Sequence, residues 1–213
     1  MLVRFILLFL LTTTTLFAQK DWVETQLKTK KKGLDLALQN KNSPDIALKM
    51  LELGTIYNQY GLYANALSYY QDALKQIQTH KKDTLLVQIN NAIGKVYHAM
   101  HKYEQALPFL QEASTVAKQL KYTKGQALAF SLLGENAEKR GEYETALDFE
   151  NKSLAFLNTK TDAIEIAVVH ENIGSIYEDL EQFDKAYAYF TKAYQLLKGS
   201  QSKQEANVLN NLG

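Results

Sequence analysis

The feature that most constrains this chain is a glycine that recurs at a fixed interval. Gly54, Gly94, Gly134 and Gly174 are spaced 40 residues apart, and Gly213 follows after 39. A self-similar period of this length is typical of stacked-repeat proteins, in which each module packs only against its neighbours. The length of 213 residues therefore measures a number of repeats.

Each module contains two helical patterns separated by a turn. In the first module, apolar residues at three-and-four spacing predict a helix over residues 47–60 and a second helix over 63–79, with a break at Gly61. The same two patterns return in register in the later modules. The chain is therefore predicted to be all-α and built of helix-turn-helix hairpins.

Two columns of small residues predict how the helices pack. Glycine inside a helix costs about 1 kcal/mol relative to alanine, so a glycine column indicates that another helix passes very close. A second column consists of Ala66, Ala106, Ala146 and Ala186. We predict that large side chains pack against both columns, among them the tyrosines that follow the glycines by three residues, Tyr57, Tyr97 and Tyr177.

The third module departs most from this pattern. It has Ala137, Glu150 and Ser153 where the other modules mostly carry aromatic residues, apolar residues or alanine.

The repeated pattern Leu/Ile-Gly-x-x-Tyr, followed by Gly-x-Tyr-x-x-Ala-Leu, resembles the tetratricopeptide repeat. Its 40-residue period is similar to that of the longer class of these repeats, since the common form has about 34 residues. The resemblance implies a right-handed superhelical α-solenoid of antiparallel helix hairpins. The predicted repeats are residues 47–86, 87–126, 127–166 and 167–205, with the start of a fifth over 206–213.

The N-terminal residues predict export. Arg4, the apolar run over 5–11 and a small residue at Ala18 resemble a cleavable signal peptide over 1–18. The protein would then be periplasmic or extracellular. An uncleaved anchor is the alternative, but a membrane span needs about 20 mainly apolar residues.

Residues 19–46 are predicted to form a capping helix region that covers the first hairpin. Within it, a lysine cluster could contact an anionic partner, but we interpret it as a solvated helix face. The cluster consists of Lys28, Lys30, Lys31 and Lys32.

Composition and motifs exclude several function classes. The 24 Lys plus Arg residues against 23 Asp plus Glu do not indicate a nucleic-acid surface. The chain has no cysteine, which rules out disulfides and thiolate zinc sites. His170 and Glu171 begin like a zinc-protease helix, but Gly174 stands where the second histidine is required. His98 and His101 have no evident third ligand. We therefore expect no enzyme activity, no metal and no cofactor.

In tetratricopeptide proteins the first helices of successive hairpins line a concave wall that binds partners. The resemblance places eight candidate peptide-binding residues on this wall: Asn91, Lys95, Glu135, Glu171, Asn172, Ser175, Asn210 and Asn211. Asparagine amides both donate to and accept from a peptide backbone, so they are plausible clamps. The alternative, that they cap or solvate the helices, stays open.

One variant of the family grips a C-terminal carboxylate with lysine and asparagine on the first helices. Here the positions of the lysine are occupied by Leu51, Asn91, Ser131 and Glu171. A carboxylate-clamp co-chaperone is therefore not expected.

Two functional hypotheses follow from these observations. The first is an exported scaffold that binds a protein or peptide by its concave face. The second starts from the unfinished fifth repeat and takes the chain as the N-terminal piece of a longer protein. It would then be the sensory region of a membrane-bound histidine kinase or a helix-turn-helix transcription regulator, with any membrane span after residue 213. An exposed last repeat would also allow self-association.

Overall fold

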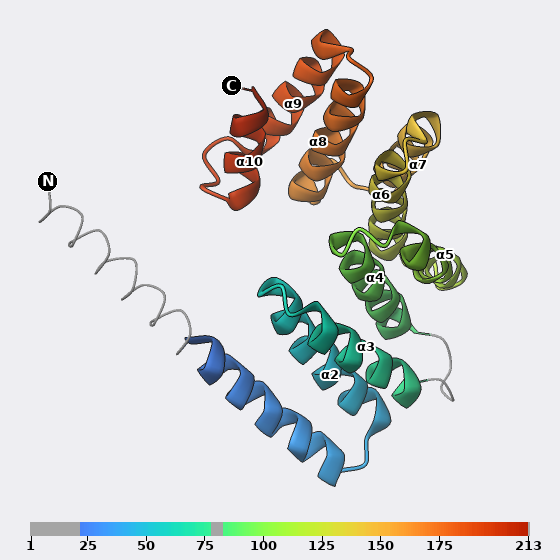
Figure 1. Cartoon of the computed structure of the whole chain (residues 1–213), viewed down its shortest axis with the longest axis vertical. Coiled ribbons are helices and arrows are strands. Elements are labelled where there is room, and N and C mark those ends of the chain that lie inside the picture. The colour runs from blue at the N-terminus through green and yellow to red at the C-terminus, as the bar shows by residue number, and fades with distance from the viewer. Residues whose placement is uncertain (1–21, 78–82, 213) are drawn as a thin grey trace, which may run out of the picture. The chain divides into compact units, whose positions relative to one another are not determined.

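The computed structural model describes residues 22–77 and 83–212, which form helices joined by short turns (Figure 1). The chain divides into two compact units, residues 1–80 and 81–213. The two described ranges contain no strand, so the predicted all-α class is confirmed. The predicted signal peptide over 1–18 lies outside the described residues.

Across the described ranges, the search for a helix with the length and apolar character of a membrane span finds none.

The first unit contains a helix over residues 22–39, α2 (Ser43–Gln59) and α3 (Tyr63–Ile77). The helix α2 begins where Asn42 accepts a hydrogen bond from the backbone N–H of Asp45 at 3.4 Å, as an N-cap does. Helix 22–39 contributes Leu34 to a buried cluster that includes Leu53 of α2. It thereby covers apolar surface of the α2–α3 hairpin.

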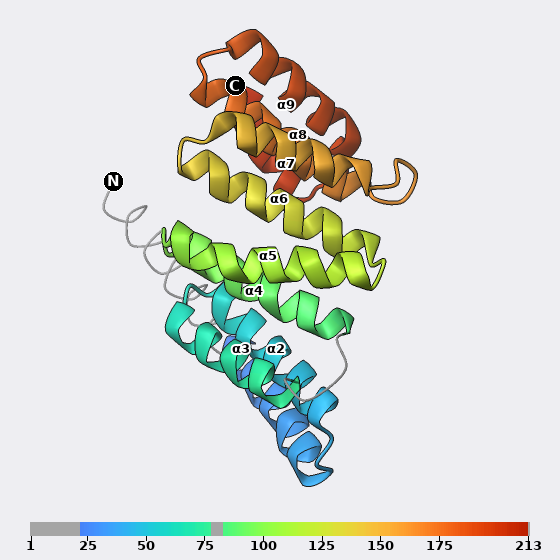
Figure 2. The ribbon, with the colours of Figure 1, turned by 90° about the vertical axis from the view of Figure 1, so that its right-hand side faces the viewer.

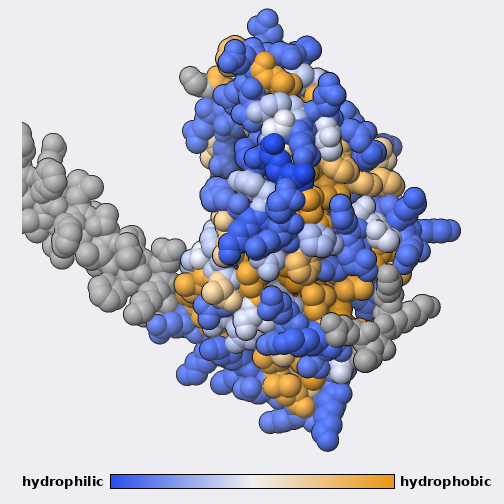
Figure 3. All heavy atoms as spheres, turned by 45° about the vertical axis from the view of Figure 1, so that its right-hand side comes forward, coloured by the Kyte–Doolittle hydropathy of each residue, from blue (hydrophilic) through white to orange (hydrophobic). Residues whose placement is uncertain are grey.

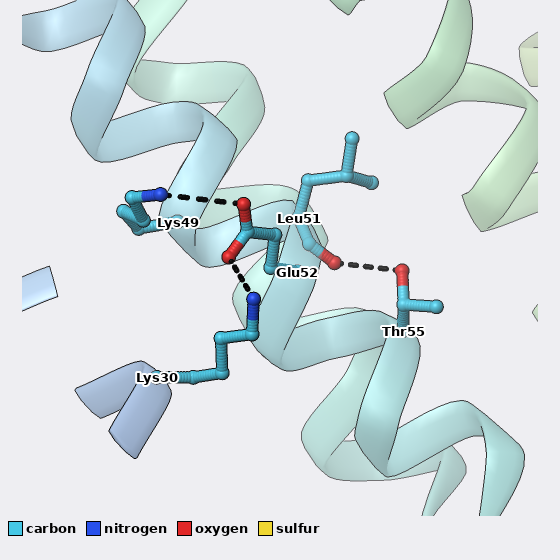
Figure 4. Close-up of polar contacts among 5 residues, drawn as sticks. All are labelled: Lys30, Lys49, Leu51, Glu52 and Thr55. Carbon is cyan, nitrogen blue, oxygen red and sulfur yellow. Dashed lines mark hydrogen bonds and ion pairs between the residues drawn. The ribbon is translucent and has the colours of Figure 1, made fainter. Parts of the chain in front are cut away.

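Lys30 of the basic cluster joins helix 22–39 to α2 by an ion pair (Figure 4). Lys30 Nζ lies 2.8 Å from Glu52 Oε2, and Lys49 Nζ lies 3.3 Å from Glu52 Oε1. Lys30 is therefore paired within the chain, although its side chain is still 39 % exposed. Beside this pair, the Thr55 hydroxyl donates to the Leu51 carbonyl at 2.8 Å (Figure 4).

The second unit is a stack of hairpins. Its helices are α4 (Thr84–Ala99), α5 (Tyr103–Gln119), α6 (Thr123–Lys139), α7 (Tyr143–Ala155), α8 (Ala163–Asp179), α9 (Phe183–Leu197) and α10 (Lys203–Leu212). Hairpins form between α4 and α5, α6 and α7, and α8 and α9, while α5 packs on α6 and α7 on α8 (Figure 2). The first helices also contact one another, α4 with α6 and α6 with α8. This arrangement is the predicted α-solenoid.

Each hairpin turns at a residue in the left-handed region of φ. Gly61 and Gly141 have φ values of 70° and 76°, and His101 and Glu181 both have 57°. At Gly141 the backbone N–H donates to the Glu138 carbonyl, as in a Schellman helix ending. The break predicted at Gly61 is confirmed, and two modules make the same turn without glycine.

The glycine column is packed differently from the prediction. The side chains that lie against Gly54, Gly94, Gly134 and Gly174 are Tyr70, Leu110, Glu150 and Phe190, one from the second helix of each hairpin. The predicted tyrosines instead stack on a neighbouring aromatic ring: Tyr57 on Tyr69, Tyr97 on Phe109 and Tyr177 on Tyr189. The alanine column is buried as predicted, with Ala66, Ala106 and Ala146 at 0 % and Ala186 at 3 % exposure.

Candidate functional site

The second unit has a groove on its first helices, with a volume of about 400 Å³. The helices α6 and α8 supply most of its wall. Equivalent positions repeat along them, since Lys124 and Leu128 of α6 correspond to Ile164 and Val168 of α8. Its apolar lining consists of Ala127, Leu128, Leu157, Ile164, Val168 and Val169.

The apolar lining reaches the surface at two large side chains. Leu128 is 40 % exposed and Ile164 is 53 % exposed. On the face drawn in Figure 3, hydrophobic side chains likewise come to the surface between hydrophilic ones. Exposed apolar residues that border a concave site are the usual features of a binding groove.

The rim of the groove carries both charge signs. Lys124 Nζ forms an ion pair with Asp162 Oδ1 at 2.9 Å. Asp162 also accepts from the backbone N–H of Asn158 at 2.8 Å, and this bond is the main cause of its lowered pKa. These contacts order the connection between α7 and α8 beside the groove. Lys95 of α4 lines the groove and is exposed.

The inner end of the groove leads to a buried polar cluster. Ser131 of α6 and Ser153 of α7 line this end. The Ser153 hydroxyl donates to the Ala127 carbonyl at 2.8 Å. Ser131 Oγ accepts from Asn172 Nδ2 of α8 at 3.1 Å, and the same amide donates to Glu150 Oε1 of α7 at 2.9 Å. Three helices therefore meet through one side-chain amide.

Glu150 is the most deeply buried acid of this cluster. It is 0 % exposed, and its Oε2 has no hydrogen-bond partner among the described residues. Burial raises the pKa of Glu150 well above its usual range, and the charges of Glu135 and Glu138 raise it further, against hydrogen bonds from Asn172 and Ser131. Burial therefore favours the neutral form of this carboxyl more than that of an exposed glutamate.

The structure brings together three of the predicted binding residues. Glu135 Oε1 lies 3.3 Å from Asn172 Nδ2, so both belong to the cluster, and Lys95 lies at the groove beside it. Asn91 is 2 % exposed, and neither its Nδ2 nor its Oδ1 has a partner among the described residues. Its role as a peptide clamp stays a prediction.

The other four predicted residues lie further along α8 and on α10. Asn211 Nδ2 donates to Glu171 Oε1 at 3.3 Å, and burial raises the pKa of Glu171. Ser175 is half-buried, and Asn210 is exposed. These four residues are not part of the groove lining, and their peptide-binding role also stays a prediction.

Sequence reasoning missed the apolar lining and the role of Glu150. The eight residues predicted for the wall are all polar or charged, whereas Leu128 and Ile164 expose apolar surface on it. A signal was available for the second miss. Glu150 and Ser153 stand out as polar residues in columns that are otherwise apolar or small.

The three histidines that the structure describes contact aromatic rings. His101 Nδ1 lies 2.8 Å from the Tyr103 hydroxyl, and the His98 ring lies 5.3 Å from the Tyr103 ring. The ring of His170 lies 5.7 Å from that of Tyr189. Among the described residues, no three His, Asp or Glu side chains are placed to hold a metal ion.

Models of known protein families match most of the repeats. A family model described as tetratricopeptide repeat matches residues 45–119 and 84–159, and a second model of the same description matches 167–196. Together these matches cover more than half of the chain.

Two curated proteins are similar in sequence. The Tonsoku-like protein of Drosophila melanogaster is 23 % identical over 192 residues, which are 81 % of this chain and 13 % of that protein. The response regulator aspartate phosphatase A of Bacillus subtilis (strain 168) is 29 % identical over 147 residues, 68 % of this chain and 38 % of that protein. The chain thus spans less than half the length of either relative.

Solved structures share the fold. BtubC from P. vanneervenii superposes with a TM-score of 0.73 at 18 % identity, covering 89 % of this chain and 81 % of that chain. A Rap protein complexed with Competence and Sporulation Factor has a TM-score of 0.70 at 14 % identity, covering 91 % and 59 %. At such identities the likeness shows the helical solenoid alone.

Proposed function

This chain belongs to the tetratricopeptide repeat family, and from that premise we propose that it is a scaffold that binds an extended peptide segment of a partner protein. The site is the groove on the first helices of the second unit, which in this family form the concave wall. A similar solved structure, the Rap protein, is complexed with a factor. A scaffold role without catalysis agrees with the general role of this fold.

The observation that carries the proposal is an apolar groove that two successive first helices line at equivalent positions. Leu128 of α6 and Val168 of α8 correspond in register, and Leu128 is 40 % exposed. Packed helices lie about 8–10 Å apart, and an extended peptide advances about 3.3 Å per residue. The distance between neighbouring helices therefore corresponds to about three residues of an extended segment.

Both ends of the groove favour a peptide as the occupant. Peptide bonds carry obligatory donors and acceptors, which need polar partners when they leave water. Ser131 and Ser153 offer such groups at the inner end, and Lys95 offers a cation at the rim. An apolar side chain of the peptide would pack between these polar groups against Leu128.

The test uses a peptide that the protein itself selects. A phage-displayed library of random peptides is selected on the immobilised chain, and the recovered peptide is labelled with fluorescein for anisotropy titrations. Leu128→Asp is expected to weaken binding at least 10-fold, because it places a charge on the apolar lining.

Leu196→Asp is the matched control, since Leu196 of α9 is 39 % exposed and is not among the residues that line the groove. The control should bind like the original chain. Equal affinities for all three proteins would reject the groove as the site.

The protein is also proposed to be exported through residues 1–18, a proposal that rests on the sequence pattern alone. An alkaline phosphatase fused after residue 30 reports on this directly, because that enzyme is active only outside the cytoplasm. Activity that disappears when residues 5–11 are replaced by polar residues is the expected result. An inactive fusion that is expressed at a normal level would refute export.

A further inference from the structure

Glu150 occupies a position that is filled by aromatic or aliphatic residues in the three other described hairpins. The equivalent side chains are Tyr70, Leu110 and Phe190, and each lies against the glycine of its own module. Leu110 at Gly94 shows that an aliphatic side chain fits such a niche. Packing alone therefore does not require a carboxyl at residue 150.

The carboxyl is also a poor choice for stability. It is 0 % exposed, and Oε2 has no hydrogen-bond partner among the described residues. A buried oxygen without a partner loses its hydrogen bonds to water and gains no hydrogen bond within the protein. Because the carboxyl destabilises the niche that it occupies, its presence is better explained by contacts that it makes outside this niche.

That role is visible in the contacts of Glu150 with the groove. Its Oε1 accepts from Asn172 Nδ2 at 2.9 Å, and Asn172 donates in turn to Ser131 Oγ at 3.1 Å. Ser131 belongs to the groove lining, whereas Glu150 and Asn172 do not. Glu150 therefore reaches the groove through Asn172 and Ser131.

We propose that Glu150 is a positioning residue for the peptide site, holding Asn172 and Ser131 so that the Ser131 hydroxyl binds a backbone carbonyl of the peptide. This inference rests on the proposed function. A serine hydroxyl has one hydrogen, for which a peptide carbonyl and an ionised Glu150 carboxylate would compete. Protonation of Glu150 weakens its hold on the Ser131 hydrogen and favours donation to the peptide, whereas ionisation strengthens that hold.

The charges around Glu150 agree with this arrangement. From α6, Glu135 and Glu138 disfavour a second negative charge, although Lys139 pairs with Glu138 at 2.7 Å. From α8, Glu171 contacts Asn211 of α10, and His170 lies against Tyr189 of α9. On α7 itself, Asp148 pairs with Lys152. Among the described residues, no cation forms an ion pair with the Glu150 carboxyl, so its own pKa governs the effect.

Two substitutions separate positioning from packing, using the labelled peptide selected by the original chain. Glu150→Leu restores the side chain found at Leu110, so the protein should unfold at a higher temperature and yet bind the peptide about 10-fold more weakly, the effect of one lost hydrogen bond. Glu150→Gln keeps a neutral acceptor for Asn172. It should bind within about 2-fold of the original chain at low pH.

The pH profile is the readout that a packing role would not change. Affinity of the original chain should fall as the pH rises through the pKa of Glu150, whereas Glu150→Gln should show no such fall. Tight binding by Glu150→Leu at every pH, with Leu128→Asp still defective, would overturn this inference and leave the proposed function intact. Undiminished binding by Leu128→Asp would overturn the proposed function itself.

Discussion

Glu150 of α7 lies so close to Gly134 of α6 that a Cβ on the glycine would be 2.7 Å from the carboxyl oxygen Oε1. Real Cβ atoms do not approach other atoms this closely, so any larger residue at 134 would force the buried Glu150 side chain to shift. The same relationship joins Gly94 to Leu110 and Gly174 to Phe190. The third hairpin therefore keeps the repeat's geometry while placing a carboxyl in an apolar niche.

Glu150→Leu is expected to raise the free energy of unfolding by about 1–3 kcal/mol, because it removes a buried oxygen that has no partner. Urea denaturation followed by circular dichroism measures the change. The reverse substitution, Leu110→Glu, is the matched control and should destabilise by about 2 kcal/mol or more. If both variants destabilise equally, the niche does not prefer an apolar side chain.

The free energy of unfolding should also decrease as the pH rises, because of Glu150. Burial raises its pKa in the folded chain, so the folded state holds a proton that the unfolded state releases above its own pKa of about 4.3. Between these two pKa values the folded state binds more protons, and the free energy of unfolding decreases as the pH rises. Above the folded pKa, the loss is complete.

Glu150→Gln removes this titration. The stability of the variant relative to the original chain should therefore increase between about pH 4.5 and pH 7, as measured by urea denaturation at both values. A difference that does not depend on pH would mean that Glu150 titrates normally.

The bond between Asn172 and Glu150 should appear as coupling in a double-mutant cycle. Asn172→Ala is expected to cost about 1–3 kcal/mol, because it leaves the buried Glu150 without its amide donor. In the Glu150→Leu background the same change should cost about 1 kcal/mol less. Equal costs in both backgrounds would show that the 2.9 Å contact does not contribute to stability.

Two glycine-to-alanine substitutions should have opposite effects. Gly94→Ala is expected to destabilise by about 1–3 kcal/mol, since the new methyl group would overlap the Leu110 side chain. Gly33→Ala should stabilise by about 0.5–1 kcal/mol, because the nearest atom, Lys49 Cδ, would lie at an ordinary 3.6 Å and alanine favours the helix. Thermal unfolding of the two variants tests both signs, and destabilisation by Gly33→Ala would contradict the second.

The helices and their turns were largely predictable from local pattern. The apolar spacing located the paired helices, and Gly61 located a turn whose φ of 70° suits glycine. The turns at His101 and Glu181 were less evident, because neither residue is a usual choice for the left-handed region. In those modules the two helices already determine how the chain must reverse.

The candidate site was predictable only in part. Lys95, Glu135 and Asn172 were assigned to one wall from their register, and they do lie at the groove or in the cluster beside it. The apolar lining was missed because Leu128 and Ile164 are the same residue types that fill the core. Only the neighbouring helices decide which of them stay exposed.

The sequence by itself determined the repeat, its hairpins and the need for close approach at each glycine, because these follow from spacing and from the steric cost of a side chain within a helix. The tertiary structure decided which side chain meets each glycine and what Glu150 contacts. Those choices depend on the angle and depth at which helices pack, so side chains distant in sequence, such as Ser131, Glu150 and Asn172, become neighbours only after the hairpins have stacked.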